Sequence, residues 1–128
     1  MKISVMITMF AFVATLALSI PVFAHHGGSE YDMQHETTVT GGTVTNFAYL
    51  NPHVEISWET KDDKGVVQKW TAKTTNPNTL YRAGWNKETL KPGTQLQSVT
   101  GNRCKDGSNC MRLRKIMLAN GRELPVPQ

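Results

Sequence analysis

The sequence lacks a glycine-rich phosphate-binding loop, and it lacks a strong charge of either sign. Its 14 Lys and Arg residues stand against 10 Asp and Glu residues, which gives a formal net charge of +4. Removal of Lys2 with the N-terminal segment described below leaves 13 basic residues against 10 acidic ones. This excess is too small to indicate nucleic-acid binding. The missing loop argues against a nucleotide cofactor.

A long uncharged run occurs only at the N-terminus. Residues 3–20 carry no charge, Lys2 precedes them and Pro21 ends them. Val22 and Ala24 then supply the branched and small residues that a signal peptidase site requires. We therefore predict a secretory signal peptide over 1–24, cleaved after Ala24, and a periplasmic or secreted protein. The alternative is an uncleaved anchor, since the run approaches the length of a membrane span, but no permanently charged residue follows it directly.

The remaining chain is long enough for one modest core. Residues 25–36 are polar, with two glycines and three of the four histidines, and predict a flexible leader. Residues 37–128 are predicted to form a single small domain. After signal cleavage we expect no stable membrane span.

Alternation of apolar and polar residues with period two dominates this domain and predicts strands. The only helix signal begins at Asn76, a good N-cap, with Pro77 in the first helical position and Gly84 at the end. The predicted strands cover 37–49 with a break at Gly41-Gly42, 53–61, 66–74, 94–103 and 110–118, with a last short strand ending at Leu124.

The order of these elements predicts the fold class. Three strands, one short helix and two further strands form the sequence of elements in a small five-stranded OB-like barrel, with the helix between strands three and four. Closing the sheet would also remove exposed strand edges. A flat meander and a small sandwich are the alternatives, although five strands are few for a sandwich.

Cysteine is scarce, since Cys104 and Cys110 are the only two in the chain. An exported protein meets oxidising conditions, which makes a disulfide the default. A redox-active pair normally has C-x-x-C spacing at a helix start. A zinc site would need two more ligands, and none lies close to this loop in sequence. We predict a structural disulfide.

The placement of the histidines indicates a candidate metal site. Cleavage after Ala24 would make His25 the N-terminal residue, so its amine and ring nitrogen can chelate one metal ion. His26 would add an imidazole, and His35 or His53 would complete a nitrogen-rich set that suits copper(II). The other interpretation is a polar leader, with His53 capping the start of the second strand.

Signatures of catalysis are missing. The sequence contains no nucleophile elbow and no convincing pair of acids in a cleft. We therefore predict a non-enzymatic protein that binds a small ligand or a periplasmic protein. The residues that a β fold does not need for packing are its candidate site residues: His25, His26, His53, Asp32, Asn51 and Arg82.

Arginine residues supply two further interpretations. Arg82 lies near Trp85, where it can pair with a carboxylate, stack on the indole or simply hold the helix to the barrel. Arg112 and Arg114 fall on one strand face, where they can hold an anionic ligand, contact an acidic membrane surface or remain solvated.

The alternative function is a periplasmic copper-binding protein that uses His25, His26 and His53.

The motifs of the chain include Ala24-His25-His26, Tyr31-Asp32, Asn51-Pro52-His53-Val54, Leu80-Tyr81-Arg82-Ala83-Gly84-Trp85, Leu90-Lys91-Pro92-Gly93 and Asn120-Gly121-Arg122-Glu123-Leu124. Together they resemble a known family of small secreted bacterial proteins, the domain of unknown function 6152. The resemblance covers nearly the whole mature chain. It implies an exported protein of Gram-negative bacteria with a compact β fold, and it implies no particular activity, substrate or cofactor. The two cysteines are not expected from the family pattern.

Overall fold

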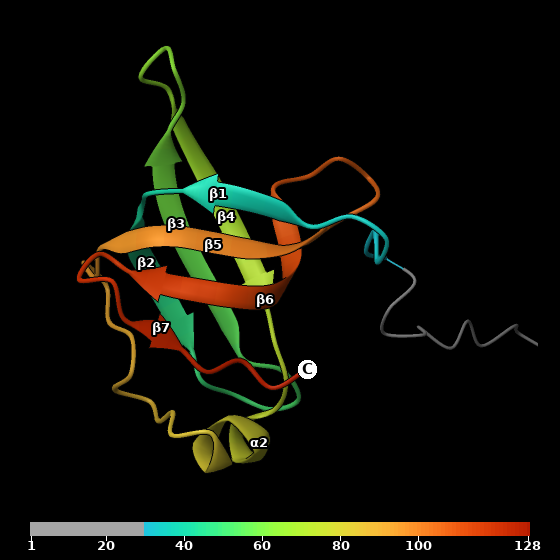
Figure 1. Ribbon diagram of the computed structural model, residues 1–128, viewed down its shortest axis with the longest axis vertical. Coiled ribbons are helices and arrows are strands. Elements are labelled where there is room, and N and C mark those ends of the chain that lie inside the picture. The colour runs from blue at the N-terminus through green and yellow to red at the C-terminus, as the bar shows by residue number, and fades with distance from the viewer. Residues whose placement is uncertain (1–29) are drawn as a thin grey trace, which may run out of the picture.

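A computed structural model describes residues 30–128 (Figure 1). The predicted signal peptide, its cleavage site and the candidates His25 and His26 lie outside these residues. Within them the protein is mainly β, with one short helix, as the residue pattern predicts. The elements are β1 (Thr37–Thr40), β2 (Thr43–Ala48), β3 (Glu55–Lys61), β4 (Val67–Lys73), α2 (Pro77–Arg82), β5 (Leu96–Arg103), β6 (Cys110–Leu118) and β7 (Glu123–Leu124).

The break between β1 and β2 follows from two glycines. Gly41 and Gly42 have φ angles of 71° and 128°, which residues other than glycine rarely adopt. A Cβ on Gly42 would also lie 2.7 Å from Cδ1 of the buried Trp58. The predicted break at this position is therefore confirmed, and the chain bends closely over a core tryptophan.

The hairpin of β3 and β4 owes its register to its turn. The Asp62 carboxylate accepts hydrogen bonds from the backbone N–H groups of Lys64 and Val66, both at 2.9 Å. Opposite each other in this register, Trp58 and Trp70 stack with ring centroids 6.0 Å apart. The far end of this hairpin projects beyond the rest of the domain (Figure 1).

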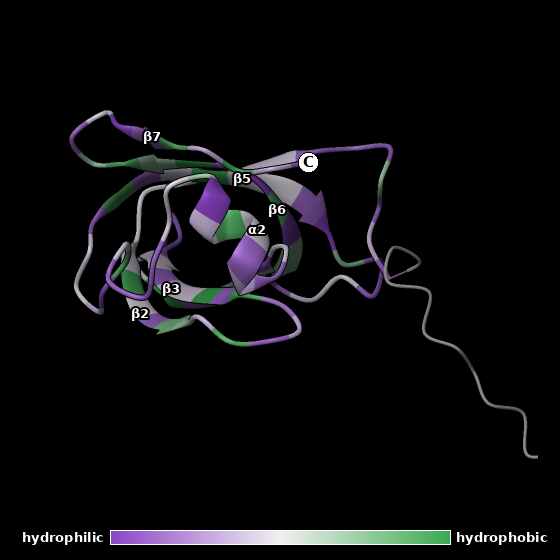
Figure 2. Ribbon diagram, turned by 90° about the horizontal axis from the view of Figure 1, so that it is seen from below, coloured by the Kyte–Doolittle hydropathy of each residue, from purple (hydrophilic) through white to green (hydrophobic). Residues whose placement is uncertain are grey.

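The helix α2 begins and ends where the sequence predicts. The Thr79 N–H donates to Oδ1 of Asn76 at 3.0 Å, and Gly84 leaves the helix with a φ of 97°. Leu80 is the fully buried residue of α2. Seen from below, α2 lies within the outline of the curved sheet and covers that end (Figure 2).

All seven strands belong to one sheet, in the order β1-β5-β6-β4-β3-β2, with β7 paired to β6. The β4–β6 pair is parallel. This topology is neither a meander nor a two-sheet sandwich. The strand pairs do not close the sheet into a barrel, so the five-stranded OB-like barrel is not confirmed. The strand count differs from five because the glycine break divides the first predicted strand and because the predicted last short strand, β7, pairs with β6.

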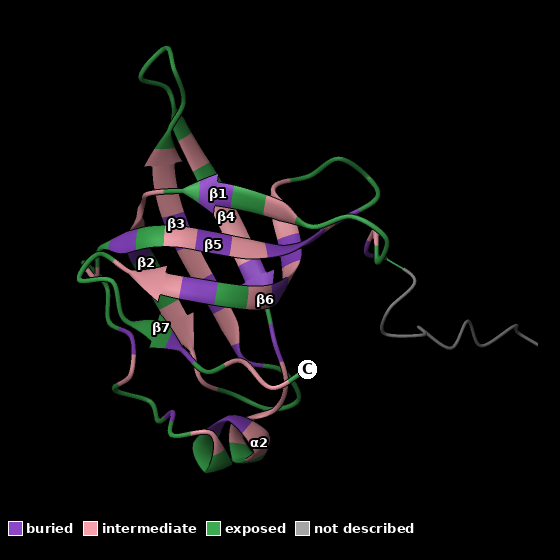
Figure 3. Cartoon of the chain, viewed as in Figure 1, coloured by how far each residue is buried: buried purple, intermediate pink, exposed green. Residues whose placement is uncertain are grey.

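The core lies inside the curve of the sheet, where buried positions alternate along the strands (Figure 3). Val54, Ile56 and Trp58 are fully buried on one face of the β3 region, as the alternation predicts. Burial of such side chains contributes roughly 1.5–3 kcal/mol each and is the main stabilising term. Residues 30–128 contain no helix that is long and apolar enough to cross a membrane.

Candidate functional site

One polar hollow of about 250 Å³ collects several residues that the core does not need. Its walls come from the N-terminal segment, the turn before β3, the end of β4, the start of β6 and the C-terminal tail. The lining residues are Glu30, Tyr31, His53, Lys73, Thr74, Thr75, Arg112, Leu113 and Pro127.

Backbone pairing beyond the strand ends places His53 in this hollow. The Val54 N–H donates to the Thr75 carbonyl at 3.0 Å, and the Thr74 N–H donates to the Val54 carbonyl at 2.9 Å. These bonds extend the β3–β4 ladder past its last strand residues. His53 is therefore held opposite Thr74 and Thr75 while its side chain stays exposed.

The parallel pair of β4 and β6 brings two cations together. Lys73 and Arg112 are register partners on these neighbouring strands, so their side chains leave the same face of the sheet. Glu55 is the register partner of Lys73 on its other side, across β3. Within residues 30–128, neither Lys73 nor Arg112 forms an ion pair.

Tyr31 closes the hollow on the N-terminal side. Its side chain is buried, and burial, followed by a hydrogen bond to the Glu30 carboxylate, raises the pKa of the phenol to about 12. The negative charges of Glu30 and Glu55 add to this rise, whereas Arg112 opposes it. The hydroxyl of Tyr31 therefore stays protonated at neutral pH.

The disulfide loop holds this wall in place. Cys104 and Cys110 form the predicted disulfide. Tyr31 pairs with Cys104 as an isolated antiparallel bridge, and the Lys105 N–H donates to the Glu30 carbonyl at 2.9 Å. The packed part of the domain therefore begins before β1, within the segment that the composition predicts as a leader.

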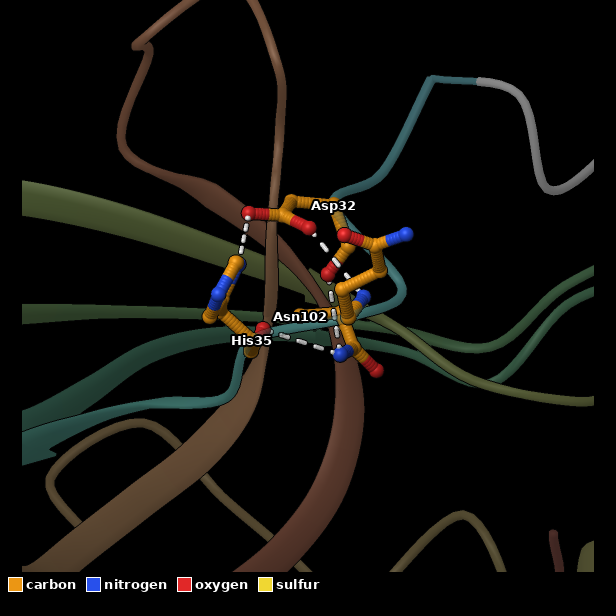
Figure 4. Close-up of polar contacts among 4 residues, drawn as sticks. Asp32, His35 and Asn102 are labelled. Atoms are coloured by element: carbon orange, nitrogen blue, oxygen red, sulfur yellow. Dashed lines mark hydrogen bonds and ion pairs between the residues drawn. The ribbon is translucent and has the colours of Figure 1, made fainter.

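A second polar cluster joins the same segment to the sheet (Figure 4). Nδ1 of His35 lies 2.9 Å from Oδ2 of Asp32, and this contact is the largest cause that lowers the pKa of the Asp32 carboxyl. The buried amide of Asn102 donates to the carbonyls of Asp32 and His35, both at 3.0 Å. Its Oδ1 accepts from Nε of Arg114 at 2.6 Å. This cluster fixes the turn rather than lining the hollow.

The candidates predicted from sequence are thus only partly brought together. His53 and Arg112 line the hollow, and Asn51 is exposed in the turn just before it. Asp32 adjoins the hollow through Tyr31 but belongs to the second cluster. His25 and His26 are not among the described residues.

Arg82 lies elsewhere, exposed at the end of α2. In the described part of the chain it makes no ion pair, and the one cation–π contact joins Arg103 to Trp70, at 5.0 Å. The indole N–H of Trp85 donates instead to the Pro125 carbonyl at 2.6 Å. The predicted stacking of Arg82 on Trp85 is therefore not found.

Sequence reasoning missed Lys73, Thr74, Thr75 and Tyr31 as lining residues. Lys73 appears in the sequence as one exposed strand residue among many. Its proximity to Arg112 depends on a parallel pairing between strands that 36 residues of chain separate, and local periodicity does not encode this pairing.

Fold and site together define a small, mainly β domain with one helix, one disulfide and a polar hollow. The family model described as "Family of unknown function (DUF6152)" matches residues 13–112. The chain belongs to this family, which confirms the resemblance seen in its motifs. No curated protein and no solved structure matches the chain.

Proposed function

We propose that this protein is an exported, non-enzymatic binding module whose hollow holds a small anionic ligand bearing a carboxylate. The observation that carries the proposal is the register pairing of Lys73 and Arg112 at the hollow. Like charges on neighbouring strands repel each other. An anion bound between them would remove that repulsion.

Arg112 is the better anchor of the two. Lys73 has Glu55 as its cross-strand neighbour on one side, whereas Arg112 has Asn102 as its register partner on β5. A guanidinium presents a planar fork of donors that matches a carboxylate in two parallel hydrogen bonds. The hydroxyls of Thr74 and Thr75 and the ring of His53 are further polar groups in the same wall.

Ligand size follows from the hollow. A space of about 250 Å³ suits a small molecule and lies just below the usual range for drug-sized ligands. The hollow also adjoins the disulfide loop through Glu30, so we expect its N-terminal wall to stay ordered without a ligand. We therefore expect binding without a large rearrangement.

The strand order supports an OB-like arrangement as the scaffold of this module. β1 and β2 occupy the two ends of the strand path and are separated in sequence only by Gly41 and Gly42. If β1 and β2 are counted as one bent strand, the strand order without β7 contains five strands, and this bent strand lies at both of its ends, as in an OB-like barrel. The Val44 N–H donates to the Thr94 carbonyl at 2.9 Å, which joins β2 to the residues that lead into β5, the neighbour of β1.

A titration tests the ligand proposal. The mature protein is titrated with small mono- and dicarboxylates and with inorganic phosphate, and backbone amide shifts around the hollow are followed by NMR. We expect saturable binding of a carboxylate that weakens at least tenfold in Arg112→Gln and remains unchanged in Arg122→Gln. Equal binding by both variants, or shifts that avoid the hollow, would refute the proposal. If phosphate binds more tightly than every carboxylate, the proposal names the wrong class of anion.

The absence of enzymatic activity is tested separately. Incubation with panels of hydrolase and oxidase substrates should give no turnover above a heat-treated control. Turnover that one substitution in the hollow abolishes would show that the protein is an enzyme. Export is tested by N-terminal sequencing of the periplasmic protein, which should begin at His25.

Copper binding is the second candidate function, supported by accessible imidazoles. His53 is exposed at the hollow, and Asp32 orients His35 through Nδ1. A histidine whose Nδ1–H is held by a carboxylate presents Nε2 to a metal. Glu30 lines the same hollow, and five residues of chain span at most about 18 Å. A processed His25 would therefore lie no more than this length of chain away from Glu30, which lines the same hollow as His53.

The anionic ligand and the copper ion of these two proposals would occupy the same hollow. Lys73 and Arg112 favour an anion and oppose a divalent cation, which is why the anionic ligand ranks first. Copper(II) affinity is compared between protein that starts at His25 and protein with one extra N-terminal Ala. The extra residue should weaken binding by orders of magnitude, because it removes the chelate of amine and ring. Equal, weak binding by both preparations would exclude this role.

A further inference from the structure

The disulfide loop contains a cluster of three side chains that can bind a metal ion. The side chains of Cys104, Asp106 and Cys110 place one ligand atom each within 4.8 Å of one another. In a tetrahedral zinc site with thiolate and carboxylate ligands, the ligand atoms lie about 3.5 Å apart. Small side-chain movements would therefore complete three corners of such a site once the sulfur–sulfur bond is absent.

Hydrogen bonds hold the backbone of this loop independently of the disulfide. The Cys104 N–H donates to the Cys110 carbonyl at 2.9 Å, which pairs the two ends. Nη2 of Arg103 donates to the carbonyls of Gly107 and Ser108 and to Oδ1 of Asn109, at 3.0, 3.3 and 3.1 Å. We therefore expect the two cysteines to remain neighbours after reduction.

The carboxylate of Asp106 is fixed in the same way. Its Oδ1 accepts from the hydroxyl and then from the backbone N–H of Ser108, at 2.6 and 2.9 Å, and these bonds, in that order, lower the pKa of the Asp106 carboxyl. The Ser108 hydroxyl also lies 3.3 Å from Sγ of Cys110. Ser108 therefore holds the Asp106 carboxylate in place, and one of its oxygens lies within 4.8 Å of both sulfur atoms.

We propose that the dithiol form of this loop binds one zinc ion through Cys104, Asp106 and Cys110, with water in the fourth position. A dithiol reductant supplies two electrons and two protons to the disulfide, giving two thiols and an oxidised reductant. Zinc then displaces both thiol protons to the solvent. In the reverse step a disulfide oxidant takes two electrons from the thiolates and two protons from the solvent and becomes a dithiol, while the Cys104–Cys110 bond forms again and the ion is released. Metal binding and the disulfide therefore exclude each other.

Cationic neighbours favour the thiolate forms that this site needs. The Arg103 guanidinium is bonded within the loop, and Lys105 follows Cys104 directly. Positive charge beside a cysteine stabilises the thiolate. The open fourth position and the exposed Asp106 leave the ion accessible from solvent.

The test uses cadmium as the probe, because cadmium–thiolate bonds have an ultraviolet charge-transfer absorption that histidine ligands do not give. Mature protein is reduced with a dithiol, freed of reductant without oxygen and titrated with Cd²⁺, and Zn²⁺ then competes for the site. We expect one thiolate-bound ion per chain in the reduced protein and no such absorption in the oxidised protein. Metal ions bound elsewhere, including at the N-terminal histidines, should be taken up equally by the reduced and the oxidised protein, so they do not affect this comparison.

Two variants decide whether Asp106 is a ligand. Asp106→Asn keeps the acceptor oxygen for Ser108 but removes the charge, and Asp63→Asn is the matched control in the β3–β4 turn. We expect zinc affinity to fall at least tenfold in Asp106→Asn and to stay unchanged in Asp63→Asn. The double variant Cys104→Ser/Cys110→Ser should lose the charge-transfer absorption completely.

Near-ultraviolet circular dichroism of the buried tryptophans reports whether the reduced protein stays folded. A folded reduced protein with one Asp106-dependent ion supports the proposal. Equal affinity in Asp106→Asn, or loss of the tryptophan signal on reduction, overturns it, because a flexible thiol pair would then bind without the carboxylate.

Discussion

Asn102 is the buried amide through which the N-terminal segment joins the sheet, and its removal gives the sharpest test of this packing. Its side chain makes two bonds to the carbonyls of Asp32 and His35 and one from the Arg114 guanidinium. Asn102→Ala would delete all three and leave their partners without a replacement from the protein.

The expected cost follows from the type of each bond. Two neutral bonds contribute about 1 kcal/mol each, and one from a charged donor contributes about 1.5–3 kcal/mol. Arg114 is half-buried, and the segment that carries the two carbonyls lies near the surface, so water replaces part of the loss. We expect the free energy of unfolding to fall by about 2–3 kcal/mol, which lowers Tm by about 10–20 °C in a domain of this size.

The assay is urea unfolding followed by tryptophan fluorescence, with Asn120→Ala as the control. Asn120 accepts one backbone hydrogen bond from the Arg122 N–H in an exposed turn, so its loss should cost about 0.5 kcal/mol. Hydrogen exchange at the Asp32 N–H, which donates to the Arg103 carbonyl at 2.8 Å, should accelerate only in Asn102→Ala. Equal stability losses in the two variants would refute the reasoning.

Three further predictions concern other parts of the fold. Gly42→Ala should lower the free energy of unfolding by roughly 1–3 kcal/mol in urea denaturation, because its Cβ would meet Trp58 at a φ of 128°; an unchanged midpoint would contradict the close approach. The Asp32 carboxyl should titrate by NMR below its ordinary pKa of 3.8 and move up towards it in His35→Gln. Since the folded pKa is lowered, the stabilisation from this contact is present at neutral pH and is lost as the pH falls through that lowered value. Reduction of the Cys104–Cys110 disulfide should cost about 2 kcal/mol by the chain-entropy relation and leave the protein folded, as thermal unfolding with and without reductant would show.

Local chemistry of the sequence determined most of the secondary structure. The alternation of Val54, Ile56 and Trp58 identifies the buried face of the β3 region, because successive side chains of a strand point to opposite sides. The Asn76 cap and Gly84 stop bound the helix, because each satisfies a requirement of a helix end. Both signals are contained within a few neighbouring residues, and local propensity is enough to read them.

The residues that line the hollow could be identified only from the tertiary structure. The hollow exists because β4 and β6 run parallel, which places Lys73 beside Arg112 although 38 residues separate them in the chain. Composition alone predicts Tyr31 in a flexible leader, yet its pairing with Cys104 buries it. Period-two alternation says which side of a strand a residue occupies, but it does not say which strand becomes its neighbour. That choice depends on the free energy of the whole packed core, so only the folded chain decides which polar residues share a site.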